Sequence, residues 1–555
     1  MRKVAVALIA LLIWSVGSVA PSSAATVSTV VIHYQPAAGN IDAWNLWIWE
    51  PGQTGRTVEF TGTDAFGKVA TIEFDHAVTD IGFIVKVGAW EKKDGNLDRS
   101  IRNFENGRAE VWVKGGVATV YTNNPSIVLP KPLLPSWARS ASIYEVNVRQ
   151  FSSASNKFNA VKAQLPRLKA LGVKILWLMP IHPISVEGRK GTLGSPYAVK
   201  DYLGVNPEYG TLADFRSLVN AAHEQGFYVV MDWVANHTGL DNLWVQQHPE
   251  WFTFVNGQLQ PNKDWTDVAD LNFDNQEMRQ AMIDAMKYWV NEVDIDGFRC
   301  DFSGGVPTSF WNEATRQLLQ LKPLFMLSEN DSDYSHLDSA FVANYGWTLM
   351  RDMNTFAERG EDAYDFVSTL QHINRSYPAG TFAMNFITNH DENSWNGTEY
   401  ERLGAFVKRF SALYFTLPGM PLIYNGQEIG LKRRLEFFEN DPIVWSKSTM
   451  TDFYRKFVAL KTRNVALWNG SSGGTLKQYM GTNPNVLFYT RVKGSSKVIV
   501  AINLSAKVQS TTVKLGSTSG NLYRFATGAK VKVASTHKFT VGAGSYEIYS
   551  TNLVK

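Results

Sequence analysis

The feature that most constrains the fold is an alternation of two kinds of segment between residues 142 and 467. Short apolar runs typical of buried strands are separated by helix-length amphipathic segments. The strand candidates begin near Ser142, Val173, Phe227, Ile295, Leu324, Ser339, Thr381 and Met420. Eight such β/α units predict an α/β fold, a closed (β/α)₈ barrel, more readily than an open doubly wound sheet. The long connection after the third strand predicts a small insert at about 238–272.

The segments on both sides of the predicted barrel have a different pattern. Residues 26–121 contain short runs of Val, Ile, Trp and Phe separated by Gly, Asp and Asn, as in an all-β sandwich. A Pro-rich linker follows at 122–141, and proline interrupts regular structure. Residues 468–555 return to the β pattern and predict a C-terminal β-sandwich.

The first 25 residues have the pattern of a secretory signal peptide. A basic tip precedes an apolar run at 4–20, and small residues follow it. A membrane anchor is the alternative, but the run is short and ends in a small-residue site. The sequence therefore predicts a secreted, extracellular protein without membrane attachment once the signal is removed. Its single cysteine, Cys300, excludes an internal disulfide.

The charge and composition narrow the class of ligand. The net charge is only +3 and no basic tract occurs, so no nucleic-acid partner is expected. Aromatic residues make up 13% of the chain, more than an aliphatic core requires, and they suggest surfaces that hold flat neutral ligands. No organic cofactor is expected.

A charged pair interrupts the apolar strand predicted at 294–304. Arg299 and Asp301 share one face of that strand, because alternate side chains point the same way. Phe298 and Cys300 share the opposite face and are expected to pack under the helices. The polar pair is then expected to face the barrel lumen near its C-terminal mouth, where barrel enzymes carry their catalytic groups. A neighbouring cation lowers the pKa of a carboxylate, so we expect Arg299 to hold Asp301 ionised.

Three other predicted strand ends add polar groups to the same mouth. They are Asp232, Asn236 and His237 after the third strand, Glu329 after the fifth, and His390 with Asp391 after the seventh. One Arg–Asp pair is more often a structural ion pair, but gathering at C-terminal strand ends favours a functional site. Paired carboxylates suit glycoside hydrolysis, in which one is nucleophile or base and the other is acid. Asp301, beside Arg299, is the better nucleophile. Glu329, with no cation beside it in sequence, is the better proton donor.

Six short segments carry a family resemblance. "DWVANH", "GFRCD", "LSEN" and "FITNHD" resemble the four successive signature segments of the α-amylase family, glycoside hydrolase family 13. "VADLN" resembles that family's fifth segment, and "GSPYAVKDYLGVNPEYGT" resembles the stretch after the second strand. The resemblance covers about 142–467 in the family's order. It implies a retaining mechanism with Asp301 as nucleophile, Glu329 as general acid/base and Asp391 gripping hydroxyls of the distorted sugar.

The resemblance also implies roles for residues around these three. Arg299, His237 and His390 would hold the sugar at the cleaved bond, Tyr197 would stack beneath it, and Asp232 would support the site. Asn236 matches a residue that often binds calcium in that family, so a calcium ion is the one cofactor considered. The family commonly has a lysine and a histidine after the nucleophile, whereas here "FSGGVP" follows. This departure puts in question a lysine contact on the leaving-group side and part of the calcium site.

Tryptophans in the predicted N-terminal sandwich sort by parity. In "AWNLWIWEP", Trp44 shares one face of the strand with Leu46 and Ile48. Trp47 and Trp49 share the opposite face. If the first set forms the core, the outward indoles make a flat apolar ledge that can stack on sugar rings. The alternative is a strand covered on both faces, or a face that docks on the barrel.

A later segment can complete this ledge. Trp90 in "VGAWEKKDG" is expected beside the other indoles, with Lys93 and Asp94 near enough to bond sugar hydroxyls. Residues 27–121 resemble the starch-binding module of pullulanases, carbohydrate-binding module family 41. That resemblance implies that Trp47, Trp49 and Trp90 bind starch.

Together these patterns predict an α-glucan hydrolase that acts on starch, pullulan or maltooligosaccharides. We favour α-1,4 cleavage, as in α-amylases or neopullulanases, because the Tyr-Asn-Trp-Gly-Tyr-Asp-Pro segment of debranching pullulanases is absent. An α-1,6 debranching pullulanase is the alternative. An inactive glucan-binding protein on the same barrel is a hypothesis of another class, since a fold can persist after its catalytic activity is lost. The joint presence of Asp301, Glu329 and Asp391 weighs against it.

Overall fold

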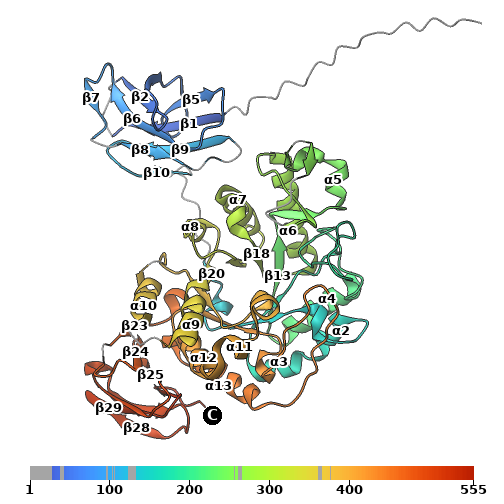
Figure 1. Cartoon of the computed structure of the whole chain (residues 1–555), viewed down its shortest axis with the longest axis vertical. Helices are drawn as coiled ribbons and strands as arrows, with labels where there is room; N and C mark the ends of the chain where they lie inside the picture. The colour runs from blue at the N-terminus through green and yellow to red at the C-terminus, as the bar shows by residue number, and fades with distance from the viewer. Residues whose placement is uncertain are drawn as a thin grey trace, which may run out of the picture. The chain divides into compact units, whose positions relative to one another are not determined.

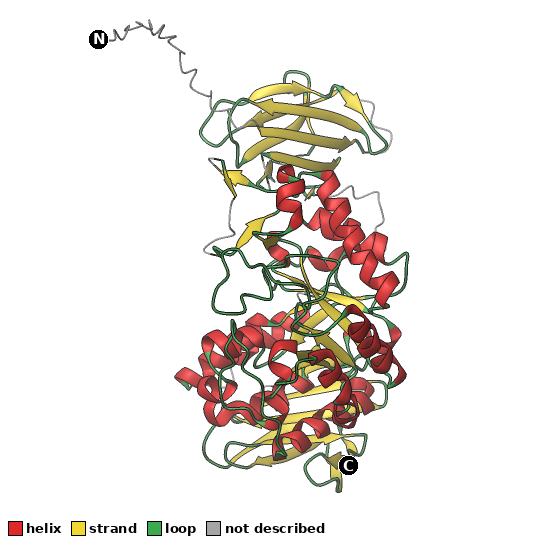
Figure 2. Cartoon of the chain, turned by 90° about the vertical axis from the view of Figure 1, so that its right-hand side faces the viewer, coloured by secondary structure: helices red, strands yellow, loops and turns green. Residues whose placement is uncertain are grey.

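The computed structural model describes residues 28–37, 43–95, 98–102, 104, 107–122, 133–255, 257–259, 265–360, 365–375, 377–479 and 481–554 (Figures 1 and 2). The predicted signal peptide, 1–25, and residues 123–132 of the predicted linker lie outside this set. The chain divides into two units, one ending at Val128 and the other beginning at Leu129. Within the described ranges, no helix is long and apolar enough to cross a membrane.

Two β-sheets form the first unit. One has the order β10 (Val120–Tyr121), β9 (Arg108–Lys114), β1 (Ser28–Gln35), β5 (Lys68–Phe74) and β4 (Gly62–Thr63). The other has the order β3 (Arg56–Glu59), β2 (Trp44–Trp49), β6 (Ile81–Val87) and β7 (Lys92–Lys93), and β8 (Arg99–Ile101) also pairs with β6. Trp44, Leu46 and Ile48 are buried in the core between the sheets, as their parity predicts.

A closed barrel of parallel strands dominates the second unit. Its strands, in order around the barrel, are β11 (Ile143–Val146), β12 (Ile175–Leu178), β13 (Tyr228–Val234), β18 (Gly297–Asp301), β19 (Phe325–Ser328), β20 (Ala343–Tyr345), β21 (Phe382–Asn385) and β22 (Met420–Tyr424). Pairing of β22 with β11 closes the ring. Each strand lies inside one of the predicted apolar runs, so the predicted (β/α)₈ barrel is confirmed.

Helices cover the outside of the barrel (Figure 2). They are α1 (Val148–Phe151), α2 (Lys157–Ala163), α3 (Leu165–Leu171), α4 (Leu212–Glu224), α6 (Gln276–Val293), α7 (Thr308–Leu318), α8 (His336–Ser339), α9 (Trp347–Arg359), α10 (Asp365–Arg375), α11 (Glu399–Leu403), α12 (Val407–Thr416) and α13 (Thr449–Arg463). Helix α6 buries Met278, Met282, Met286, Trp289 and Val293, a stripe at helical spacing that faces the strands. Helix α4 starts at a capping box formed by Thr211 and Asp214.

A small insert follows β13, as the long connection predicts. Strand β14 (His237–Gly239) pairs with β17 (Val268–Asp270), and between them lie α5 (Leu243–Gln247), β15 (Phe254–Val255) and β16 (Gln258–Leu259). The register of the first pair sets His237 opposite Asp270. The insert therefore begins and ends at the mouth of the barrel.

The C-terminal region is rich in β-structure, as predicted. One sheet has the order β23 (Thr475–Gln478), β24 (Val486–Lys493), β25 (Ser496–Asn503), β30 (Tyr546–Ser550), β27 (Gly520–Arg524) and β28 (Lys530–Val533), and β26 (Gln509–Lys514) pairs with β29 (Thr536–Val541). It packs on the barrel helices: Arg409 of α12 donates to the Asn503 carbonyl at 3.1 Å, and Arg491 donates to the Thr416 carbonyl at 3.1 Å.

Candidate active site

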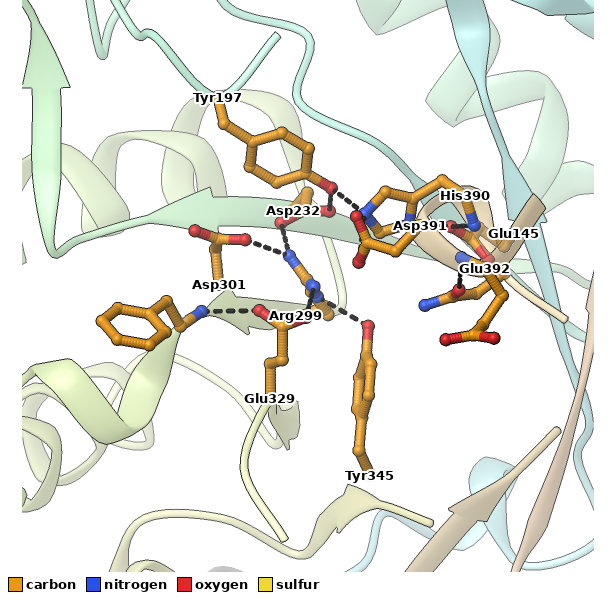
Figure 3. Close-up of polar contacts among 12 residues, drawn as sticks. Glu145, Tyr197, Asp232, Arg299, Asp301, Glu329, Tyr345, His390, Asp391 and Glu392 are labelled. Carbon is orange, nitrogen blue, oxygen red and sulfur yellow. Dashed lines mark hydrogen bonds and ion pairs between the residues drawn. The ribbon is translucent and has the colours of Figure 1, made fainter. Parts of the chain in front are cut away.

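One buried arginine joins carboxyl groups from three neighbouring strands (Figure 3). Arg299 Nη1 donates to Asp232 Oδ1 and to Asp301 Oδ1, each at 2.8 Å. Its Nη2 lies 2.6 Å from Glu329 Oε1. Parallel strands β13 and β18 pair in a register that sets Asp232 beside Arg299, and Glu329 directly follows β19. The predicted polar face of the fourth strand therefore does point into the lumen. Phe298, on the other face, packs against Trp233.

Burial sets the protonation of the two catalytic candidates. It raises the pKa of Asp301 to about 6, although Arg299 opposes the shift. Arg299 does lower this pKa, as expected, but the loss of water on burial outweighs the one shared cation, so the net shift is upward. Burial raises the pKa of Glu329 further, to about 8, and the negative charges of Asp301 and Asp391 add to the rise against Arg299. At neutral pH, Asp301 is the ionised partner and Glu329 the protonated one.

A second ion pair stands beside the first. His390 Nδ1 lies 2.5 Å from Glu145 Oε1, and its Nε2 lies 2.7 Å from the Tyr197 hydroxyl and 3.3 Å from Asp391 Oδ2. Burial disfavours a charged imidazole, yet Asp391 and Glu145 together raise the pKa of His390 to about 9. His390 is therefore a cation at neutral pH, and its Nε2–H donates to the Tyr197 hydroxyl. The Tyr197 hydroxyl in turn donates a hydrogen bond to Asp232 Oδ2, at 3.1 Å.

Glu145 was not expected from the sequence. It lies on β11, fully buried, in the run "IYEV". A charged residue inside an apolar strand is the same signal that identifies Arg299, so parity could have found it. Two other partners carried no such signal. Tyr345 accepts from Arg299 Nε at 2.9 Å, and Trp177 donates to Asp232 Oδ2 at 3.1 Å.

A cavity of about 760 Å³ opens above these groups, a size typical of ligand sites. The expected residues that line it are Asp301, Glu329, Asp391, Tyr197, His237 and His390. Arg299 and Asp232 are buried behind this lining, where they hold the carboxylates rather than meet a ligand. Burial lowers the pKa of His237 to about 4, so this imidazole is neutral. Aromatic residues that the sequence did not single out complete the lining: Trp265, Phe302, Trp347, Trp395, Phe437 and Phe438.

The segment after Asp301 packs tightly against Glu329 and Gly305. The backbone N–H of Phe302 donates to Glu329 Oε2 at 2.7 Å. Phe302 has φ 39°, a conformation that costs free energy for a residue with a side chain, and such strain often occurs at functional sites. A methyl group at Gly305 would lie 2.4 Å from Phe302 Cε1. Glycine at 305 therefore leaves room for the Phe302 ring.

The surroundings of Asn236 bear on the calcium expectation. Asn236 Nδ2 lies 3.3 Å from Asp270 Oδ1 and 3.3 Å from His237 Nδ1. Ca²⁺ takes about six to eight oxygen ligands. Within the described residues, no group of three or more His, Cys, Asp and Glu side chains could hold a metal ion. A calcium ion here would rely on Asn236, Asp270 and backbone carbonyls. It stays a prediction, and no catalytic step depends on it.

The tryptophan ledge of the first unit is partly as expected. Trp47 and Trp90 pack together with ring centroids 5.4 Å apart, and Trp90 is 43% exposed. Their ring planes are tilted by 57°, so the two indoles do not form the flat surface that the sequence predicted. Lys93 Nζ lies 5.2 Å from the Trp90 ring centre. Trp49 lies flat on Gly82, where a methyl group would come within 2.2 Å of the indole.

Asp94 differs from this set. It is buried, its Oδ2 accepts from Arg99 Nη2 at 2.8 Å, and its Oδ1 accepts from the Gly116 N–H at 2.7 Å. Both of its oxygens are thus used inside the fold. The expectation that it would bond sugar hydroxyls is replaced by a structural role, because parity and proximity in sequence do not reveal a buried partner five residues away.

Comparisons with known proteins divide the chain in the same way. The family model described as "Alpha amylase, catalytic domain" matches residues 147–267, 257–323 and 343–493. The model described as "Bacterial pullanase-associated domain" matches residues 28–122. Among curated relatives, Alpha-amylase MalA of Haloarcula japonica is 27% identical over 459 residues, which cover 76% of this chain and 65% of that protein.

Two solved structures are more similar in sequence. A noncanonic maltogenic alpha-amylase, AmyB, from Thermotoga neapolitana is 33% identical with a TM-score of 0.69, over 75% of this chain and 99% of that chain. An alpha-amylase from Lactobacillus plantarum is 33% identical with a TM-score of 0.67, over the same shares.

Proposed function

The chain belongs to the α-amylase family of glycoside hydrolases, and we propose that it is a secreted, retaining enzyme that cleaves α-1,4-glucosidic bonds in starch, pullulan and related α-glucans. One observation supports this most directly: Asp301, Glu329 and Asp391 line one cavity. The first two share the same arginine, Arg299. Glycoside hydrolysis uses a pair of carboxyl groups with different pKa values, one ionised and one protonated.

The first half of the reaction uses the ionised and the protonated carboxyl groups together. Asp301 attacks the anomeric carbon while Glu329 gives its proton to the glycosidic oxygen. The bond between that carbon and that oxygen breaks, and the leaving chain departs with a free hydroxyl. The remaining glucan is held as an ester on Asp301. Arg299 keeps both groups in place without blocking either cavity-facing side.

The second half reverses the roles. Water attacks the same carbon, and Glu329, now ionised, takes the proton from the water. Asp301 leaves as a carboxylate, and two inversions give net retention. Asp391 and the cationic His390 face the cavity and can hold sugar hydroxyls as acceptor and donor. Glu145 behind His390 keeps that donor charged.

The first unit supports a binding role. Its match to a pullulanase-associated domain and the exposed Trp90 against Trp47 favour stacking on glucose rings. We place starch attachment there, with Lys93 beside the ledge. Attachment would raise the local concentration of chain ends and loops near the enzyme.

Product analysis tests the bond that is cleaved. On pullulan, α-1,4 attack yields panose or isopanose, and α-1,6 attack yields maltotriose. We expect the former, together with release of maltooligosaccharides from soluble starch. Maltotriose as the sole pullulan product would favour the debranching alternative, and no sugar release from any α-glucan would favour an inactive binding protein. Secretion is checked by sequencing the exported protein, which should start near residue 26.

A further inference from the structure

Three aromatic residues extend the catalytic cavity on one side. Trp395, Phe437 and Phe438 line the same cavity as Tyr197 and Asp391. The Phe437 ring lies nearly parallel to Tyr197, at 12° and a centroid distance of 6.2 Å. Trp395 packs on Phe437 at 5.1 Å and on Phe438 at 5.6 Å. These three side chains, here called the aromatic wall, continue the aromatic surface of Tyr197 along the cavity.

Burial in a core does not explain the wall. Trp395 is 51% exposed, although tryptophan is among the costliest residues to leave in water. Its place is on η4 (Glu392–Asn396), a π-helical turn that begins directly after Asp391. Such turns are rare and frequently occur at functional sites. An indole held at the rim of a cavity, with one face free, is suited to stack on a ring of the ligand.

Hydrogen bonds join the turn that carries Trp395 to the segment that carries Phe437. Asn393 Oδ1 accepts from the Leu435 N–H at 2.9 Å. Ser394 Oγ donates to the Leu435 carbonyl at 2.9 Å. The two parts of the wall therefore keep a fixed spacing before any ligand arrives, which reduces the entropy lost on binding.

Two buried polar residues of α1 hold the wall from behind. Arg149 Nη1 donates to the Phe437 carbonyl at 3.0 Å and to the Gly194 carbonyl at 2.9 Å. Gln150 Nε2 donates to the carbonyls of Glu436 and Glu439 at 2.6 and 2.8 Å. Both are at most 2% exposed, and burying such groups is costly unless they are bonded. Their hydrogen bonds hold the surface segment 436–439 in one position. This indicates that the placement of Phe437 and Phe438 in the cavity is important for binding.

The wall lies on a definite side of the reacting bond. Figure 3 shows Tyr197 and Asp391 on one side of Arg299 and Glu329 on the other. Glu329 protonates the oxygen of the leaving chain, so that chain extends past Glu329. We therefore expect the retained, glycone part to extend towards Tyr197, on which Phe437 stacks.

Building on the proposed function, we infer that the aromatic wall is a binding subsite for the glucose units on the non-reducing side of the cleaved bond. The ligand is a neutral α-glucan chain whose ring faces stack on Trp395 and the phenyl groups. Binding at this subsite should make the enzyme prefer substrates that place at least two glucose units on the non-reducing side of the cleaved bond. The wall, rather than the acids, then determines which bond of a long chain is cut.

The test uses maltoheptaose labelled at its reducing end, with the full chain and two variants, Trp395→Ala and Trp395→Phe. Weaker glycone binding makes the substrate slide towards the leaving-group side, so Trp395→Ala should lengthen the labelled products. Its kcat/KM should fall about tenfold, the effect of one lost ring contact plus its burial, mainly through KM. Trp395→Phe keeps a ring and should restore most of both properties.

A matched control separates this role from general damage. Phe254 is also an exposed aromatic residue, 45% exposed on β15, but it does not line the cavity. Phe254→Ala should leave the product pattern and kcat/KM unchanged. A further variant, Arg149→Lys, loses the guanidinium that bonds the Gly194 and Phe437 carbonyls. It should shift the products in the same direction as Trp395→Ala.

Each outcome decides between roles. An unchanged product pattern in Trp395→Ala overturns the inference even if its melting temperature falls, since a structural role alone does not move the cleaved bond. Shorter labelled products would place the wall on the leaving-group side and also overturn it. Failure of the unmutated chain to cleave maltoheptaose would instead count against the proposed function.

Discussion

The two regions proposed to bind glucan are built in opposite ways. In the barrel, every carboxyl group of the site is bonded to a cation, a phenol or a backbone N–H, and the arginine that joins them is fully buried. On the first unit, the ledge presents Trp90 to solvent with Lys93 beside it. Catalysis needs shifted pKa values, which burial and closely held charges supply together, whereas recognition needs only exposed aromatic rings. Substitutions should therefore act on rate in the barrel and on retention in the ledge.

The largest effect is expected for Glu329→Gln. The amide keeps the shape of the side chain but cannot give a proton to the glycosidic oxygen. Hydrolysis of soluble starch should fall by roughly 10³-fold or more, while retention on insoluble starch stays unchanged. Reducing-sugar release and a starch pull-down measure the two. Loss of both together would mean that the two regions do not act separately.

Removal of Glu145 should have a smaller effect and a distinctive pH signature. For the unmutated enzyme, kcat/KM should rise as pH passes about 6, where Asp301 loses its proton, and fall past about 8, where Glu329 loses its own. Glu145 helps to raise the pKa of His390 to about 9. Glu145→Gln lowers the pKa of His390 below that of Glu329. Loss of the His390 proton then sets the alkaline limb in place of Glu329, so the limb should move down by ~1 pH unit and the rate should fall ~10- to 100-fold.

The control for this variant is another buried carboxylate. Glu428 is also fully buried, but it bonds Tyr144 and Arg167 rather than cavity residues. Glu428→Gln should lower the melting temperature without moving the limbs of the pH profile. Equal shifts in both variants would contradict a positioning role for Glu145.

Substitutions in the tryptophan ledge should have a smaller effect, and only on binding to insoluble starch. Trp47→Ala removes the ring that packs on Trp90 and should weaken retention on insoluble starch by about tenfold. Turnover of a short maltooligosaccharide should stay the same. Equal losses on both substrates would favour the alternative in which this face docks on the barrel.

The smallest effect is expected for Lys93→Met. The side chain keeps its apolar length and loses the charge that lies over Trp90. An exposed cation–π contact contributes about 0.5–1 kcal/mol, so retention on starch should fall only about two- to fivefold. A loss as large as that of Trp47→Ala would mean that the lysine bonds the sugar directly.

Sequence periodicity predicted the barrel and most of the site because both depend on local rules. Strand parity alone directs Arg299 and Asp301 into the lumen, and strand ends collect Glu329 and Asp391. What depends on distant packing was not predictable. The rise in the pKa of Asp301, the bond from the Gly116 N–H to Asp94 and the position of Phe437 are all determined by segments that meet only in the fold.

The division of labour between the two acids is tested most directly with α-maltosyl fluoride, whose leaving group needs no proton. Glu329→Gln should release one equivalent of fluoride per enzyme in a fast burst, because attack by Asp301 remains intact. Asp301→Asn should release none. A burst from Asp301→Asn, or its absence in Glu329→Gln, would contradict the assignment of these two residues.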